Sequence, residues 1–227
     1  MRFFTFCAIV YALAAGLSGC QTTKGSPIDD LSTQDGLVRA ESKNLDALYV
    51  RPNVKLSGYN KILLQPLIVS FAKNWNPEKE SSALYRMTPP DREKIKSELA
   101  AAFADVFKEV LQEKGGYQLV TAPADDVLDV QSAIVNLFIN APDVSQQTAG
   151  NVRTYTTNAG EMTLIAELHD SVTGQLLSRG YDRREDTNSG MWTWTNSVTN
   201  SADARREIRR WAELLKKALD ASRGKVS

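Results

Sequence analysis

The strongest constraint on this chain is a cysteine that directly follows an apolar N-terminal segment. Phe3–Leu17 is apolar, Arg2 precedes it, and the run Leu17-Ser18-Gly19-Cys20 ends it. At about 15 residues the segment is shorter than the roughly 20 needed to span a bilayer, which indicates a cleaved signal peptide. Small residues before the cysteine and a leucine three positions upstream match a bacterial lipobox. We expect cleavage between Gly19 and Cys20 and lipid attachment to the Cys20 thiol, the alternative being an ordinary signal peptide that carries a cysteine.

This assignment determines which forces can hold the fold. The chain has 227 residues and two cysteines. Cys7 leaves with the signal peptide and Cys20 is lipidated, so no thiol remains for a disulfide, a cysteine nucleophile or a cysteine metal site. About 208 residues remain, which is enough for one domain with a hydrophobic core. We expect this core alone to stabilise the domain.

The residue after the cysteine bears on location. Gln21 occupies this position, where an aspartate would indicate retention in the inner membrane by enteric-type sorting. Two or more acyl chains anchor a protein stably to a membrane, whereas one does so only marginally. We expect a lipid-anchored protein of the bacterial cell envelope, held at the outer membrane and facing the periplasm. Inner and outer membrane both remain open.

Charge excludes some partners. The chain has 27 basic and 27 acidic residues, and removal of the signal peptide takes away only Arg2. A balanced chain has no basic footprint for nucleic acid and no strong attraction to anionic lipid. Basic residues gather after Ser201, but acidic residues are interleaved with them. We therefore expect a solvated helix face there.

Composition divides the chain into three parts. Residues 1–19 are the predicted signal peptide. Residues 20–43 are polar and lack apolar periodicity, which predicts a lipidated N-terminus and flexible tether. Residues 44–224 are the predicted single globular periplasmic domain.

Apolar periodicity predicts two helices in this domain. The first, about 91–114, opens at Pro89-Pro90-Asp91 and ends at Gly115-Gly116. The second, about 202–221, has a buried stripe. The residues of that stripe are Ile208, Trp211, Leu215 and Leu219.

Five apolar runs predict strands, with a turn at Asp170–Gly174 and an edge position or bulge at Pro66. The runs are 61–69, 117–120, 127–139, 161–170 and 175–184. We therefore expect an α+β sandwich with one mainly antiparallel sheet of about four to five strands. Both helices should pack on one face of this sheet.

Four features together resemble a known family. They are the lipobox at Cys20, the segments Leu48–Pro52 and Glu167–Gly174, and the closing helix that contains Trp211. The chain resembles bacterial lipoproteins of the domain of unknown function 3313 family over about residues 30–222. The resemblance implies a location and a fold, and it assigns no activity.

The single histidine invites a catalytic interpretation. His169 is followed by Asp170 and Ser171 at the end of a predicted strand. A nucleophilic triad needs serine, histidine and aspartate side chains that converge, whereas neighbouring strand residues point to opposite faces. We expect a surface or rim histidine and no catalytic residues.

Two groups of acidic residues could form a cation site or a paired-carboxylate site, but their spacing does not match either. A cation site at Asp125, Asp126 and Asp129 would lack the glycine and final glutamate of a calcium loop. Strand alternation should send Asp129 to one face of the strand and leave the other two at its entry, so we expect turn and cap roles and no metal. Three further acidic residues lie on predicted strands at no spacing diagnostic of a paired-carboxylate site. They are Glu161, Glu167 and Asp182.

Two polar segments contain the candidate partner surface. Residues 143–160 include Tyr155, and residues 187–201 include Trp192 and Trp194. Aromatic side chains among threonine, serine and asparagine suit contact with a protein partner, a glycan or a membrane interface. Alternatively, Trp192 and Trp194 share one face of a short strand and pack under the second helix.

These observations predict a non-catalytic interaction or accessory module in the periplasm. Its only modification is the covalent lipid on Cys20, and it has no cofactor. We expect envelope proteins as partners besides the membrane. The alternatives are a module that binds a glycan, a peptidoglycan fragment or a lipid in a pocket between the two polar segments, and a hydrolase with dispersed carboxylates.

Overall fold

The described part of the chain folds into one eight-stranded sheet, a separate two-stranded ribbon and two long helices. The computed structural model describes residues 34–73, 88–139, 154–156, 160–185, 193–195 and 197–225. The sheet strands are β1 (Val38–Ala40), β2 (Ala47–Val50), β3 (Lys61–Leu64), β4 (Ile68–Phe71), β5 (Gln118–Val120), β6 (Val127–Ile139), β8 (Gly160–Asp170) and β9 (Leu176–Glu185). The ribbon strands are β7 (Thr154–Thr156) and β10 (Thr193–Thr195). The helices are η1 (Leu56–Gly58), α3 (Pro89–Phe107), its continuation η2 (Lys108–Glu113) and α4 (Ser197–Ser222).

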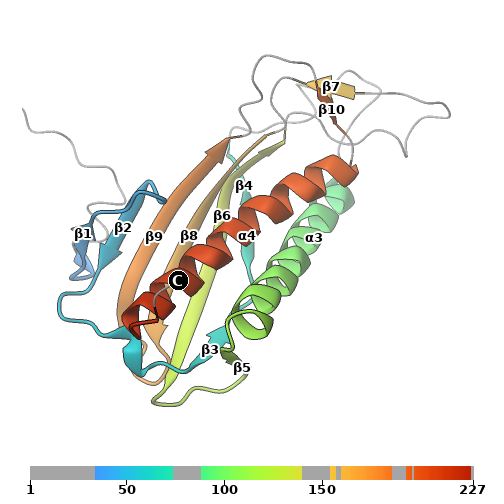
Figure 1. The fold of residues 1–227 in the computed structure, drawn as a ribbon. Helices are drawn as coiled ribbons and strands as arrows, with labels where there is room; N and C mark the ends of the chain where they lie inside the picture. The colour runs from blue at the N-terminus through green and yellow to red at the C-terminus, as the bar shows by residue number, and fades with distance from the viewer. Residues whose placement is uncertain are drawn as a thin grey trace, which may run out of the picture.

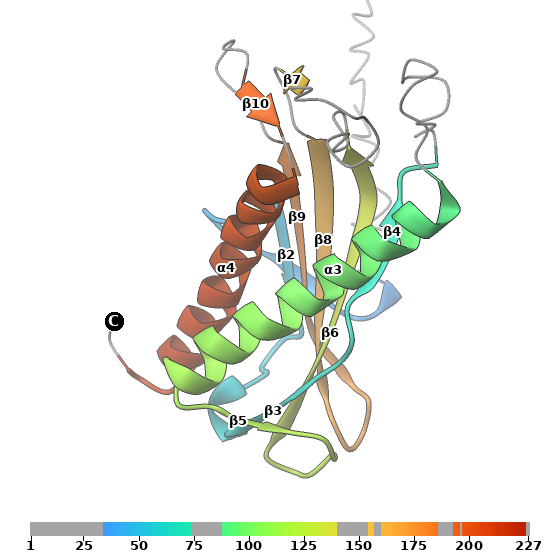
Figure 2. The same ribbon diagram turned by 90° about the vertical axis from the view of Figure 1, so that its right-hand side faces the viewer.

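Both long helices lie on one face of the sheet, as Figure 1 and Figure 2 show from two directions. The strand order is β1-β2-β9-β8-β6-β3-β5, and β4 also pairs with β6. The pairs from β1 to β6 are antiparallel, whereas β3 and β4 run parallel to β6 and β5 runs parallel to β3. The predicted α+β class with two helices on one face is confirmed. The prediction of four to five strands was too low, because it missed β1 and β2 and counted β3 and β4 as one strand.

The predicted strand at 61–69 is two strands. β3 pairs with β6 at Val127–Val130, and β4 pairs further along it from Ala133. Pro66 lies between them and has no N–H to donate to a sheet, so the chain leaves the ladder there. The predicted irregularity at Pro66 is therefore a break between two parallel strands.

The folded region begins earlier than expected. β1 pairs with β2 in antiparallel register, and Leu37 is 3% exposed in a small cluster with Ala47 and Tyr49. These residues place part of the 20–43 segment, predicted to be a flexible tether, in the edge of the sheet. A three-residue strand has too little periodicity to be recognised in the sequence.

The first helix begins and ends as its sequence predicts. The Thr88 backbone N–H donates to the Asp91 carboxylate at 2.8 Å, which satisfies one donor at the helix start. At the other end Gly116 has φ +71°, and a Cβ on Gly115 would lie 2.5 Å from the Leu111 carbonyl oxygen. Glycine is therefore needed at both positions to stop the helix.

The main core fills the space between the helices and the sheet. Ile208, Trp211 and Leu219 of α4 are buried, and Leu215 is partly buried, so the predicted stripe is confirmed. Phe103 and Phe107 of α3 stack at 3.9 Å between ring centroids. Full burial of such a side chain contributes about 1.5–3 kcal/mol. No helix in the described part of the chain is long and apolar enough to cross a membrane.

Candidate functional site

Two of the three residues predicted for a partner surface lie on paired strands. Trp194 lies directly opposite Tyr155 in the antiparallel register of β10 and β7. The two strands form their own sheet beyond the ends of β8 and β9, near the start of α4 (Figure 1). The backbone thus joins two polar segments that are far apart in the sequence. Trp192 lies outside the described residues, as do Gly19 and Cys20, and their roles stay predictions.

The single histidine belongs to a row of polar contacts across the other face of the sheet. His169 Nε2 lies 3.0 Å from Glu167 Oε2, and His169 Nδ1 lies 3.2 Å from the Gly174 carbonyl oxygen. Arg179 Nε donates to the other Glu167 oxygen at 2.6 Å, and its Nη2 pairs with Asp35 at 2.7 Å. The His169 side chain is 15% exposed, so it is more enclosed than the predicted rim position.

The neighbours of His169 do not form a nucleophilic triad with it. Ser171 Oγ donates to the Ala124 carbonyl oxygen at 3.0 Å and accepts the Ala124 N–H at 3.2 Å. Asp170 closes the predicted turn by accepting from the backbone and hydroxyl of Thr173, each at 2.8 Å. These hydrogen bonds hold the pKa of Asp170 below its ordinary value, the Thr173 backbone contact contributing most. Gly174 has φ +70°, as the turn requires.

The aspartates before and within β6, predicted as a possible cation site, have different partners. Asp126 pairs with Lys61 at 3.1 Å, in the turn role that we predicted. Asp129 is 8% exposed and accepts hydrogen bonds from the amides of Gln65 and Gln131, each at 2.8 Å. Asp129 lies within β6, on one face of the strand as alternation predicts, and these two amides bind it there. Among the described residues no group of three or more histidine, cysteine or acidic side chains is placed to hold a metal ion.

The most buried carboxylate ties α4 to the sheet. Asp182 of β9 is fully buried and accepts two hydrogen bonds from Arg184, each at 2.7 Å. It also accepts the Trp211 indole N–H at 2.6 Å and pairs with Arg210. Arg210 was predicted to lie on a solvated face and is instead part of this network. Removing one partner of such a buried pair is strongly destabilising, so the network gives Asp182 a structural role.

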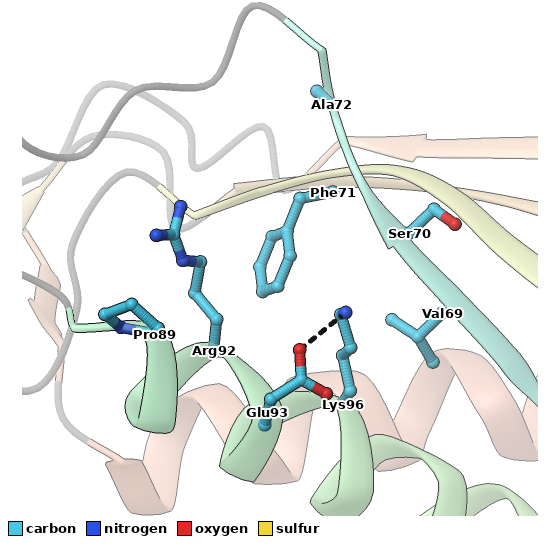
Figure 3. Close-up of a pocket in the computed structure, with 8 residues that line it drawn as sticks. All are labelled: Val69, Ser70, Phe71, Ala72, Pro89, Arg92, Glu93 and Lys96. Carbon is cyan, nitrogen blue, oxygen red and sulfur yellow. Dashed lines mark hydrogen bonds and ion pairs between the residues drawn. The ribbon is translucent and has the colours of Figure 1, made fainter.

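A shallow groove of about 490 Å³ runs between β4 and the first turns of α3. Figure 3 shows Val69 and Phe71 reaching from β4 toward the helix, while Arg92 and Lys96 reach from the helix toward the strand. Lys96 pairs with Glu93 at 2.8 Å. Sequence patterns do not predict this groove, because it joins a strand edge to a helix about 20 residues further along the chain.

A family model described as "Protein of unknown function (DUF3313)" matches residues 29–215. The chain belongs to this family. The resemblance inferred from the sequence is confirmed, and the family description assigns no activity. A search of curated proteins found no match.

Similar solved structures include two bacterial proteins described as lipoproteins. The PelC dodecamer from Paraburkholderia phytofirmans is 11% identical with a TM-score of 0.33, covering 77% of this chain and 91% of that chain. A lipoprotein from Neisseria meningitidis is 17% identical with a TM-score of 0.22, covering 67% and 96%. A Caulobacter crescentus protein assigned as a lipoprotein is 13% identical with a TM-score of 0.34, covering 76% and 97%. At these values the neighbours assign no activity, ligand or assembly to this chain.

Proposed function

We propose that this chain is a lipid-anchored, non-catalytic interaction module of the bacterial cell envelope, held at the outer membrane and facing the periplasm. The lipobox that ends at Cys20 supports the anchor. Only 13 residues separate Cys20 from Gln34, where the described structure begins. Fully extended, they reach at most about 45 Å. This tether keeps the domain close to its membrane.

The observation that carries the interaction role is the β7–β10 ribbon. It joins Tyr155 and Trp194 from two separate polar segments and stands outside the eight-stranded sheet. Tyrosine and tryptophan are among the residues most enriched in the energetic centres of protein interfaces. The carboxylates that a hydrolase would use support the same proposal, because Asp182 and Glu167 are both engaged by arginines.

Photocrosslinking in intact cells tests this proposal. A benzophenone amino acid would replace Tyr155 or Trp194, and in a control chain Val172, which is 57% exposed in the turn at the far end of the β8–β9 hairpin. The proposal predicts discrete adducts with envelope proteins from the two ribbon positions and none from the control position. Equal labelling at all three positions, or none at the ribbon, would contradict it.

A further inference from the structure

β4 forms an open and apolar edge of the sheet. It pairs with β6 on one side, and no described strand pairs with its other side. Its sequence is Ile-Val-Ser-Phe, and Ile68 is 65% exposed. Natural proteins usually protect such an edge with charged residues, proline or a bulge, because unpaired strands recruit other chains. β4 itself contains no charged residue and no proline. The one register irregularity in its pairing puts the extra residue on β6, between the partners of Val69 and Phe71, and leaves β4 regular.

The backbone of this edge is oriented for strand addition. The Ala72 N–H donates to the Leu137 carbonyl oxygen of β6 at 2.9 Å. Because hydrogen-bonding directions alternate along a strand, Ser70 also faces β6, and the N–H and C=O of Val69 face the open edge. A donor and an acceptor so placed match the backbone of an extended peptide.

The groove beside β4 adds side-chain recognition. Val69 and Phe71 form its apolar side and the helix supplies Arg92 and Lys96 (Figure 3). Lys96 is neutralised by Glu93, whereas the Arg92 guanidinium has no hydrogen-bond or ion-pair partner among the described residues. The groove therefore favours a carboxylate.

We propose that the β4 edge binds an extended, acidic peptide segment of a partner protein. The segment adds as a strand beside β4, covers Ile68 and directs a carboxylate to Arg92. A second copy of this chain fits less well, because edge-to-edge pairing would bring two cationic grooves together. The β4 edge and the β7–β10 ribbon are separate surfaces, so either can fail without the other.

Fluorescence anisotropy with a labelled probe tests this site. The probe is a capped seven-residue peptide of alternating valine and threonine with a central glutamate, and its matched control has glutamine instead. We expect saturable binding of the glutamate peptide to the folded chain. The glutamine peptide should bind about tenfold more weakly, the usual effect of losing one charge-assisted hydrogen bond.

Three variants locate the binding. Val69→Pro removes the outward N–H without removing a donor to β6, and should weaken binding at least tenfold. If that variant does not fold by circular dichroism, Ile68→Ser tests the edge by removing its exposed apolar side chain. Val172→Ser is the matched control, since Val172 is 57% exposed at a distant turn. Arg92→Gln should abolish the preference for glutamate over glutamine.

The possible results separate cleanly. Binding that is lost in Val69→Pro or Ile68→Ser and kept in Val172→Ser supports the proposal. Absence of saturable binding, or equal loss in Val172→Ser, overturns it. A concentration-dependent dimer in sedimentation that Ile68→Ser abolishes also overturns it, because a second copy would then be the natural occupant.

Discussion

The two edges of the sheet differ in how far the rest of the domain covers them. At the β1–β2 side, Arg51 donates to the carbonyl oxygens of Asp35 at 2.8 Å and Leu176 at 2.6 Å. Arg184 and Arg210 both donate to the Asn44 carbonyl oxygen, at 3.3 and 3.0 Å. At β4, four uncharged residues form the edge and Ile68 is largely exposed.

The β1–β2 edge is therefore sealed by contacts with the rest of the domain, whereas the β4 edge is available to a partner. The sealed edge is where the chain arrives from the predicted anchor. It is held there by Arg51, directly after β2, and by arginines of β9 and α4. Charge-assisted hydrogen bonds of this kind are roughly twice as strong as neutral ones. The β4 edge has no comparable set of contacts among the described residues. We infer that the first edge maintains the fold and the second is free to serve binding.

Removal of the Asp182 carboxylate should cause the largest loss of stability at the sealed edge. Asp182→Ala leaves Arg184, Arg210 and the Trp211 indole without their shared acceptor. We expect a loss of about 3–5 kcal/mol in the free energy of unfolding, typical of breaking a buried pair, measured by urea denaturation. Asp126→Ala is the control, because Asp126 is 36% exposed and its ion pair should contribute about 1 kcal/mol or less. Equal losses would show that the Asp182 network does not hold the edge.

Leu37→Ala tests whether β1 belongs to the domain. Leu37 is 3% exposed and packs against Ala47 and Tyr49. Truncation of such a side chain should cost about 2–3 kcal/mol. If urea denaturation shows no change, residues up to 43 form a tether after all and the sealed edge is smaller than described.

The ion pair between Glu109 and Arg209 lies outside both edges and shows how much a partly exposed ion pair changes a pKa. Hydrogen bonds from Arg209, and then from Lys114, lower the pKa of Glu109 to about 2. A lowered pKa in the folded state stabilises the protein above the ordinary value of 4.5, and this contribution is lost as pH falls from 4.5 toward 2. Carboxyl NMR titration should show the Glu109 midpoint rising toward 4.5 in Arg209→Gln. An unchanged midpoint would remove Arg209 as the cause.

The smallest effect on stability is expected at the available edge. Ile68→Ser and the control Val172→Ser each change a largely exposed side chain. Both should stay within about 0.5 kcal/mol of the unchanged protein in urea denaturation. A large loss for Ile68→Ser alone would mean that Ile68 is structural and that β4 is not an available edge.

Local signals in the sequence predicted local structure well. The long helices follow from apolar residues at helical spacing. Gly115-Gly116 marks the end of the first helix, by close backbone approach at Gly115 and positive φ at Gly116, and Gly174 marks a turn by positive φ. The family was also recognisable, because its features span most of the chain. The short strands β1 and β2 were missed, since three or four residues carry no clear periodicity.

Contacts between distant parts of the chain could not be predicted from the sequence. Asp182 meets Arg210 and Trp211 almost 30 residues away, and no spacing rule links a strand carboxylate to a helix across the core. Glu167 and His169 are close in sequence, but their link to Arg179 depends on the register of β8 and β9. The β4 groove depends on the crossing of α3 over the sheet, which propensity does not determine.

Metabolic labelling with a radioactive fatty acid tests the central claim, that this is a lipid-anchored envelope module. The unchanged chain and Cys20→Ala would be expressed in a bacterial host, labelled and separated into membrane and soluble fractions. We expect label in the unchanged chain, which should fractionate with the outer membrane, and no label in Cys20→Ala, which should stay unprocessed or become soluble. A Cys20→Ala chain that is still processed, labelled and membrane-bound would contradict the claim.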